Sequence, residues 1–141
     1  MMDVTALLES MVEDALDAGE DVTVAGHARP LLTRPVALRR CLSNLLQNAL
    51  RYGHSARITI SDTDALLTID IADAGPGIPE DQMEAVFEPF VRLENSRNRS
   101  TGGVGLGLAI AREAASQCGG TLTLKNVPGG LLARLALQRA G

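Results

Sequence analysis

The chain has 141 residues, of which 45% are hydrophobic, 21% charged and only 2% aromatic, which fits one soluble domain with an aliphatic core. Its formal charge of −4 argues against nucleic acid as the main partner. Lys125 is the only lysine, so a P-loop, which ends in Gly-Lys-Ser/Thr, is excluded.

No stretch is long and apolar enough to predict a membrane span, and the acidic, amphipathic start of the chain is not typical of a signal peptide. Cys41 and Cys118 do not form a metal-type pair. We therefore expect free thiols in a reducing cytosol.

Hydrophobic spacing predicts a first helix over residues 5–18, ended by Gly19. Its buried face should carry the apolar residues at helical spacing, which are Leu8, Met11, Val12, Ala15 and Leu16. A short strand follows at 22–25. Pro35 suits the first turn of a second helix, predicted over 36–52 and stopped by Gly53.

Alternating residues predict two strands, with Ile58 and Ile60 inward in one and Leu67, Ile69 and Ile71 inward in the other, joined by a polar turn at 61–65. The remaining chain predicts an irregular stretch at 74–79, a short acidic helix at 80–87, a long loop at 91–104, a helix at 106–118, and strands at 120–127 and 131–138. Hairpin strands with helices between them indicate an α/β fold with helices packed on one face of the sheet.

The second helix contains the run NLLQNALRYG, residues 44–53. Asparagine is a poor helix and core residue, yet Arg40, Asn44, Asn48 and Tyr52 recur every four residues and form a polar ridge beside the leucines. A carboxamide oxygen suits Mg²⁺, the nearby Arg51 could hold a phosphate, and Tyr52 offers a flat face for a base. A solvated helix face is the alternative.

The run DAGPG, residues 73–77, follows a strand whose inward residues are odd-numbered, so Asp73 should also point inward. A carboxylate there needs a partner, such as the exocyclic amine of adenine. Gly75 and Gly77 let backbone approach a flat ring closely. The alternative is a strand-end turn that happens to contain an acid.

Two further runs are FEPF, residues 87–90, and TGGVGLGLAI, residues 101–110. The two phenylalanines are expected to be core residues that anchor the following loop. The glycine run leads directly into a helix, whose free N–H groups suit phosphates, although a hinge without a ligand would have the same composition. Its spacing is not that of a Rossmann fingerprint.

In this order and spacing, the four runs resemble the N box, first glycine box, F box and second glycine box of the catalytic ATP-binding domain of two-component sensor histidine kinases. The resemblance covers nearly all of residues 5–138. It implies a Bergerat-type, two-layer α/β sandwich with three helices on a mixed sheet of about five strands. It also implies a single domain over 1–141, with ATP and Mg²⁺ as cofactors.

The resemblance also implies residue roles. Asp73 would read adenine, Asn48 would bind Mg²⁺ with Asn44 as its companion, Arg51 would contact phosphate, and Tyr52 would lie near the base. The remaining nucleotide contacts that it implies come from Gly75, Gly77, Ile78, Gly103, Val104, Gly105, Leu106 and Gly107, and from Arg92, Arg97 or Arg99 in an ATP lid over residues 91–104.

The family's acceptor histidine lies on a separate dimerisation hairpin, in a run like His-Glu-Leu-Arg-Thr-Pro, which is absent here. The resemblance therefore implies phosphoryl transfer from Mg-ATP to a histidine on that partner domain, a downstream response regulator, no nucleic acid, and no direct membrane contact. It places the domain in the cytoplasmic part of a membrane-bound sensor kinase. The chain is either a piece of a longer kinase or a stand-alone protein.

Three alternatives remain. ATP hydrolases of the same fold carry a glutamate four residues before the metal asparagine, where this chain has Asn44, and an amide cannot take a proton from water. A serine kinase of the anti-sigma type fits the glycine-rich lid and F box less well. The third alternative is an interaction module that has lost nucleotide binding.

Overall fold

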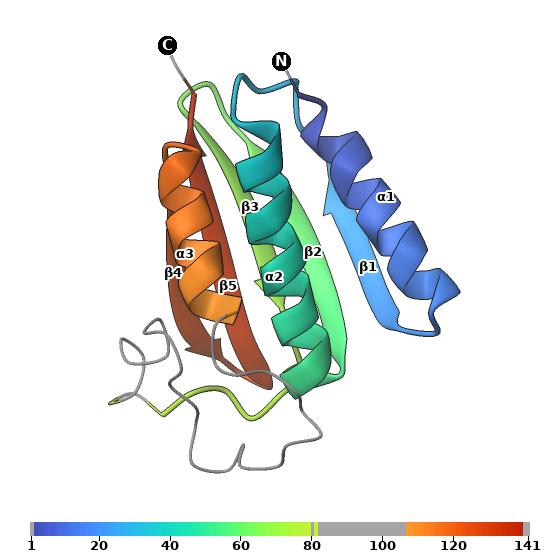
Figure 1. Cartoon of the computed structure of the whole chain (residues 1–141). Helices are drawn as coiled ribbons and strands as arrows, with labels where there is room; N and C mark the ends of the chain where they lie inside the picture. Colours follow the sequence, from blue (N-terminus) through green and yellow to red (C-terminus); the bar gives the residue numbers. More distant parts are fainter. Residues whose placement is uncertain (1, 80, 82–106, 140–141) are drawn as a thin grey trace.

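The computed structural model describes residues 2–79, 81 and 107–139. Within these residues, three helices lie on one face of a five-stranded sheet (Figure 1). The predicted class, a two-layer α/β sandwich of three helices on a mixed sheet, is confirmed. The predicted helix at 80–87 (apart from residue 81), the two phenylalanines and the predicted lid at 91–104 fall outside the described residues.

The helices are α1 (Val4–Asp17), α2 (Pro35–Gly53) and α3 (Gly107–Gln117). The strands are β1 (Asp21–Gly26), β2 (Ser55–Asp62), β3 (Leu66–Ala72), β4 (Gly120–Val127) and β5 (Gly130–Gln138).

The sheet has the order β1-β2-β3-β5-β4, so the last hairpin of the chain inserts β5 beside β3 and leaves β4 at the edge. β1 pairs with β2 in parallel, and all other neighbours are antiparallel. Side chains alternate between the two faces, and the odd-numbered residues of β3 are buried under the helices, as predicted. The pairing of β3 with β5 places the residue after β3 next to the β4–β5 turn.

α2 crosses the middle of this sheet, and its leucine stripe is buried as predicted. Pro35 occupies the first turn, where its missing N–H costs no hydrogen bond. α3 packs beside α2 and runs in the opposite direction, so it begins at the end of the sheet where α2 finishes (Figure 1).

α1 covers β1 at the edge of the sheet, and the Asp3 side chain caps it by accepting a hydrogen bond from the Ala6 N–H at 2.9 Å. The prediction that Leu16 belongs to the buried face is wrong, because this side chain is 53% exposed. Ala15 packs against the core in the last turn instead, and the helix has only an edge strand beneath it.

A partly buried ionic cluster joins three segments at the end of the sheet where both chain ends lie. The Asp62 carboxylate is 8% exposed and accepts hydrogen bonds from Arg139 Nε at 2.7 Å and Arg29 Nε at 3.1 Å. The hydrogen bonds from Arg139, and then those from Arg29, hold the pKa of Asp62 well below its usual range. The cluster connects the end of β2, the loop after β1 and the end of β5.

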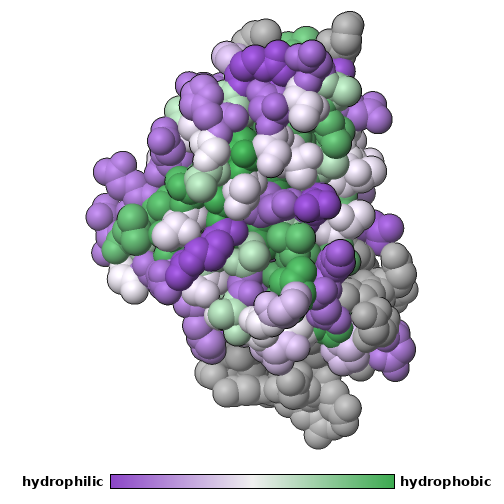
Figure 2. Space-filling view, turned by 180° about the vertical axis from the view of Figure 1, so that it is seen from behind, coloured by the Kyte–Doolittle hydropathy of each residue, from purple (hydrophilic) through white to green (hydrophobic). Residues whose placement is uncertain are grey.

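The opposite face of the sheet carries no helix among the described residues, and Figure 2 shows hydrophilic side chains interspersed with smaller apolar areas on it. Two cross-strand ion pairs lie there, Arg57 with Asp21 at 3.0 Å and Arg134 with Asp70 at 2.8 Å. Because these side chains are partly exposed to solvent, each ion pair contributes less than about 1 kcal/mol to the stability of the fold.

Candidate functional site

The end of α2 meets the segment that follows β3. A Cβ atom at Gly53 would lie 2.5 Å from the Asp73 Cγ, and one at Gly75 would lie 2.7 Å from the Tyr52 carbonyl oxygen. Figure 1 shows residues 73–79 passing beneath this end of α2. The structure thus brings together two sequence runs, around Tyr52 and around Asp73, that the sequence analysis identified separately.

Gly53 does not end α2 in the way predicted. It is the last helical residue and is buried, whereas the left-handed residue that follows the helix is His54, with φ of 62°. The glycine is needed because Asp73 fills the space that a side chain would occupy. The glycine at the helix end therefore reflects packing rather than helix termination.

The Asp73 carboxylate is half-buried and is held by backbone groups. Its Oδ1 accepts hydrogen bonds from the Gly75 N–H at 2.9 Å and the Leu131 N–H at 3.1 Å. The Asp73 N–H also donates to the Leu131 carbonyl at 2.9 Å. Oδ1 thus has protein partners without a ligand, while Oδ2 accepts no hydrogen bond from any described residue. One oxygen fixes the carboxylate, and the other can accept a donor from a ligand.

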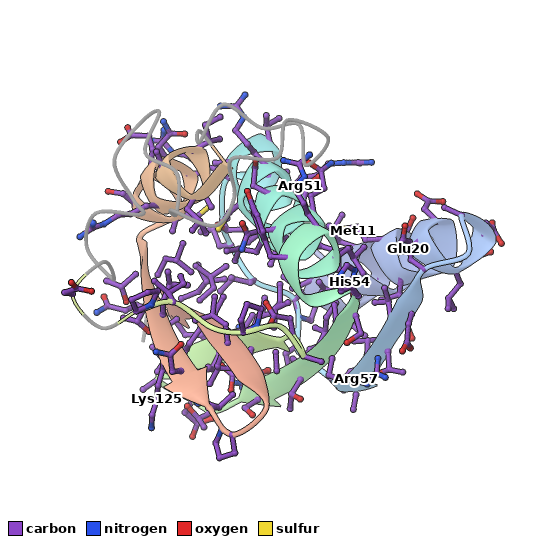
Figure 3. All side chains as sticks on the ribbon, turned by 90° about the horizontal axis from the view of Figure 1, so that it is seen from below. Met11, Glu20, Arg51, His54, Arg57 and Lys125 are labelled. Atoms are coloured by element: carbon purple, nitrogen blue, oxygen red, sulfur yellow. The ribbon has the colours of Figure 1, made fainter. Side chains whose placement is uncertain are left out.

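The predicted polar ridge lies on α2. Asn44, Asn48 and Tyr52 are half-buried, whereas Arg40 and Arg51 are exposed. Asn44 Nδ2 donates to the Arg40 carbonyl at 2.8 Å, so one of its two donor hydrogens is used within the helix. The Asn48 carboxamide forms no hydrogen bond with a described residue. Figure 3 shows Arg51 on the outer side of α2.

The loop after Asp73 is irregular, and hydrogen bonds to β4 hold its backbone in place. Gly77 has φ of +80°, a conformation that favours glycine, and Ile78 inserts its side chain into the core with 5% exposure. Asn126 of β4 binds the backbone of Ile78 in both directions, accepting from its N–H at 2.9 Å and donating to its carbonyl at 2.6 Å.

Asn126 and Leu131 were missed by the sequence analysis. They lie 48 and 58 residues from the atoms that they bind, so no local spacing connects them to the loop. In the structure, a side chain at the adjacent Gly130 would collide with the Asp73 carbonyl. In the sequence this glycine is indistinguishable from an ordinary turn residue.

Gly107 is the first residue of α3, whose N-terminal end lies at the same end of the sheet as the end of α2 (Figure 1). Free N–H groups at a helix start suit phosphate oxygens. The other predicted phosphate-side residues lie outside the described part of the chain; these are Arg92, Arg97, Arg99, Gly103, Val104, Gly105 and Leu106.

A dedicated metal cage is not found in residues 2–79, 81 and 107–139, where no three His, Cys, Asp or Glu side chains gather. The half-buried Asn48 fits Mg²⁺ only as one oxygen ligand among several. Mg²⁺ commonly keeps waters and binds through substrate phosphates, and such a metal needs few protein ligands.

Comparison with known proteins gives the family. A family model described as histidine kinase-, DNA gyrase B- and HSP90-like ATPase matches residues 33–140. The chain belongs to this ATPase family. The match begins just before α2 and includes β2 to β5, so the ATPase domain contains the whole arrangement around Asp73.

The relatives refine this assignment. The sensor histidine kinase GtrS of Pseudomonas aeruginosa is 41% identical to the ATPase domain over 141 residues, covering 99% of this chain and 29% of GtrS. The sensor protein RstB of Escherichia coli is 49% identical over 102 residues, covering 70% of this chain and 23% of RstB. The ATPase domain therefore spans less than a third of the length of these relatives.

Among solved structures, the ATP binding domain of PrrB from Mycobacterium tuberculosis has a TM-score of 0.74 and 31% identity, covering 99% of this chain and 95% of that one. The mycobacterial sensor histidine kinase MprB has a TM-score of 0.80 and 25% identity, covering 98% and 95%. The predicted assignment to the catalytic domains of sensor histidine kinases is confirmed. Among the described helices of the domain, none is long and apolar enough to cross a membrane.

Proposed function

We propose that this domain binds Mg-ATP at the end of α2 and transfers the γ-phosphoryl group to a histidine on a separate dimerisation hairpin in two-component signal transduction. The observation that carries the proposal is the Asp73 carboxylate, which is fixed through Oδ1 while Oδ2 accepts nothing from the described residues.

The adenine ring would lie against the end of α2 and the segment after β3. The exocyclic amine of adenine is a donor that suits Asp73 Oδ2, whereas guanine has a carbonyl oxygen at the corresponding ring position and would be repelled. The Gly75 backbone packs against the main chain of Tyr52, so the two segments that would contact the ring lie side by side. Asp73 Oδ2, which accepts no hydrogen bond from the described residues, supports selection of adenine over guanine.

Asn48 would offer its carboxamide oxygen to Mg²⁺, with Asn44 one helical turn earlier on the same ridge. When bound, Mg²⁺ neutralises charge on the phosphates and helps to align them. The exposed Arg51 and the N-terminal end of α3 would contact phosphate oxygens. We assign the remaining phosphate contacts to the predicted lid, including one of its arginines.

In the transfer, an imidazole nitrogen of the hairpin histidine forms a bond to the γ-phosphorus, and the bond from that phosphorus to the β–γ bridging oxygen breaks, releasing ADP. The protein contributes mainly positioning and charge neutralisation. Position 44 carries an amide rather than a carboxylate, so water is not activated by the ridge. This distinguishes the proposal from an ATP hydrolase of the same fold.

The domain spans less than a third of the length of its relatives, so its partner domains and proteins are inferred as follows. We propose that the hairpin belongs to the same kinase, that a response regulator receives the phosphoryl group, and that the domain acts in the cytoplasm as part of a membrane-bound sensor. No role in nucleic-acid binding is proposed, in keeping with the charge of −4.

The test is to incubate the domain with Mg-ATP labelled at the γ-phosphate and a candidate hairpin domain. Acid-labile, base-stable label on the hairpin is expected, together with very slow phosphate release in its absence. Rapid hydrolysis by the domain alone would favour the hydrolase. If a fluorescent ATP analogue does not bind with or without Mg²⁺, the interaction module is the better account.

A further inference from the structure

The loop that carries the proposed adenine contact is attached to the β4–β5 hairpin at two points. At its start, Asp73 exchanges hydrogen bonds with Leu131 at the beginning of β5. At its end, Ile78 exchanges two hydrogen bonds with the Asn126 side chain near the end of β4. The two attachments lie on either side of the same hairpin turn.

Asn126 acts here as a substitute for a backbone peptide group. Its carboxamide presents an acceptor to the Ile78 N–H at 2.9 Å and a donor to the Ile78 carbonyl at 2.6 Å. Because the Ile78 carbonyl can only accept and its N–H can only donate, the orientation of the carboxamide is determined by its partners. A primary amide at the length of the asparagine side chain supplies both the acceptor and the donor that the Ile78 peptide group requires.

The geometry of Gly77 shows how closely this side chain fits the loop. A Cβ atom at Gly77 would lie 3.2 Å from Asn126 Cγ and closer still to its Oδ1. The loop backbone therefore passes directly over the carboxamide. Within the part of the chain that the structure describes, only one other loop N–H between Asp73 and Ile78 donates a hydrogen bond, that of Gly75 to Asp73 Oδ1.

We propose that Asn126 is a positioning residue for nucleotide binding, which holds the loop between Asp73 and Ile78 in the conformation that receives adenine. This inference rests on the proposed function. Asn126 does not touch the adenine-reading carboxylate itself; it acts by fixing the far end of the loop, while Leu131 fixes the near end. A loop that is ordered before binding loses less conformational entropy when the ligand arrives.

Two variants separate this role from simple packing. Asn126→Ala removes both hydrogen bonds. Asn126→Asp keeps the shape of the side chain and one acceptor but places a negatively charged oxygen against the Ile78 carbonyl. A packing role predicts that the aspartate variant resembles wild type, whereas a hydrogen-bonding role predicts that both variants release the loop. Lys125→Ala, at the exposed neighbouring position on β4, is the matched control.

The experiment measures Mg-ATP affinity with a fluorescent analogue, together with hydrogen exchange at the Ile78 amide, at a temperature where circular dichroism shows each variant folded. We expect Asn126→Ala and Asn126→Asp to weaken binding by about tenfold and to lose protection at Ile78, with core amides such as those of Ile71 and Leu135 still protected. The Lys125→Ala variant should match wild type in both measurements.

Wild-type affinity in both Asn126 variants would overturn the inference, and so would weakened binding accompanied by an unchanged Ile78 amide. If the alanine variant does not fold, the near-isosteric aspartate variant decides the question. Failure of the wild-type domain to bind Mg-ATP would overturn the proposed function together with this inference. Binding by wild type and by both variants alike would overturn the inference only.

Discussion

Gly53 at the end of α2 and Asp73 after β3 lie so close together that position 53 has no room for a side chain. A Cβ atom there would come within 2.5 Å of Asp73 Cγ and 2.8 Å of its Oδ1. The last residue of the helix is therefore adapted to the carboxylate that we propose as the adenine contact. Any atom added to Gly53 has to displace that carboxylate.

Replacing Gly53 with alanine is expected to weaken Mg-ATP binding by at least about tenfold, because the methyl group moves Asp73 away from its position. Alanine is otherwise favoured over glycine in a helix by about 1 kcal/mol, so the loss would occur despite better helix propensity. Titration with a fluorescent ATP analogue measures the effect. Gly119→Ala is the control, since position 119 has a positive φ and no neighbouring atom within 4 Å. It should lower stability without changing affinity.

Asp73→Asn is expected to reduce ATP affinity by about tenfold or more, because an unmatched polar contact costs about 1–3 kcal/mol. The asparagine oxygen can still accept from Gly75 and Leu131, so its other atom becomes an NH₂ group that opposes the adenine amine. Calorimetric titration of ATP and GTP against both proteins tests this. Unchanged ATP affinity, with folding intact, would contradict the proposed adenine contact.

Asn48→Ala is expected to remove the Mg²⁺-dependent part of nucleotide affinity and to leave binding without Mg²⁺ unchanged. The reason is that a carboxamide oxygen contributes a ligand to the metal and not to the base. Paired titrations with Mg²⁺ and with a chelator measure the difference. Gln47→Ala, at the exposed neighbouring position on α2, is the matched control and should retain the full response to Mg²⁺.

The Asp62 cluster is expected to make the domain sensitive to acid. The pKa of the Asp62 carboxyl group is lowered in the folded state. Ionised Asp62 therefore contributes stability at pH values above the unfolded-state pKa of about 3.9. That contribution is lost as the pH falls below this value toward the folded-state pKa. Denaturant unfolding between pH 7 and pH 3 measures it.

Asp62→Asn is the companion to that measurement. It should lower the free energy of unfolding by about 1–3 kcal/mol at pH 7, because Arg139 loses a charged partner while 11% exposed. The variant should also lose less stability than wild type on acidification. Parallel acid profiles for the two proteins would show that Asp62 does not cause the sensitivity.

The two cysteines are expected to react very differently. Burial raises the pKa of the Cys41 thiol to about 12, so at pH 8 only about one molecule in ten thousand carries the thiolate. The pKa of the half-buried Cys118 is also raised by burial, yet this thiol has access to solvent. A thiol-reactive dye should label Cys118 slowly and Cys41 only after denaturant is added.

Labelling of a Cys118→Ser variant isolates Cys41. In the native state no rapid phase is expected, and full labelling should appear with unfolding. A rapid reaction of this variant in native buffer would contradict the buried position of Cys41.

The fold was predictable because its signals are local. Alternation in β3 placed Ile69 and Ile71 inward, and the four-residue recurrence on α2 separated its leucines from Asn44 and Asn48. The errors occurred where tertiary contacts overrule local pattern. Leu16 has the spacing of a buried residue, but α1 has only the edge strand beneath it in its last turn.

The support of the candidate site could not be predicted for the same reason. Asn126 and Ile78 are brought together by the return of the β4–β5 hairpin alongside β3, a relationship set by sheet order. The roles of the site residues remain predictions, and the predicted lid lies beyond the described residues. A pattern in one sequence identifies which residue types are suited to ATP, while contacts such as that of Gly53 with Asp73 require coordinates.

The position of the single lysine has a practical consequence. Lys125 is exposed on β4 and points away from the helices (Figure 3). Adjacent strand residues face opposite sides, so its neighbour Asn126 reaches the loop on the other side of the sheet. An amine-directed dye would find only one lysine side chain in the chain. Lys125 is therefore an attachment point for a fluorescent reporter that lies one residue from Asn126, the residue that binds the loop, on the sheet face opposite the helices.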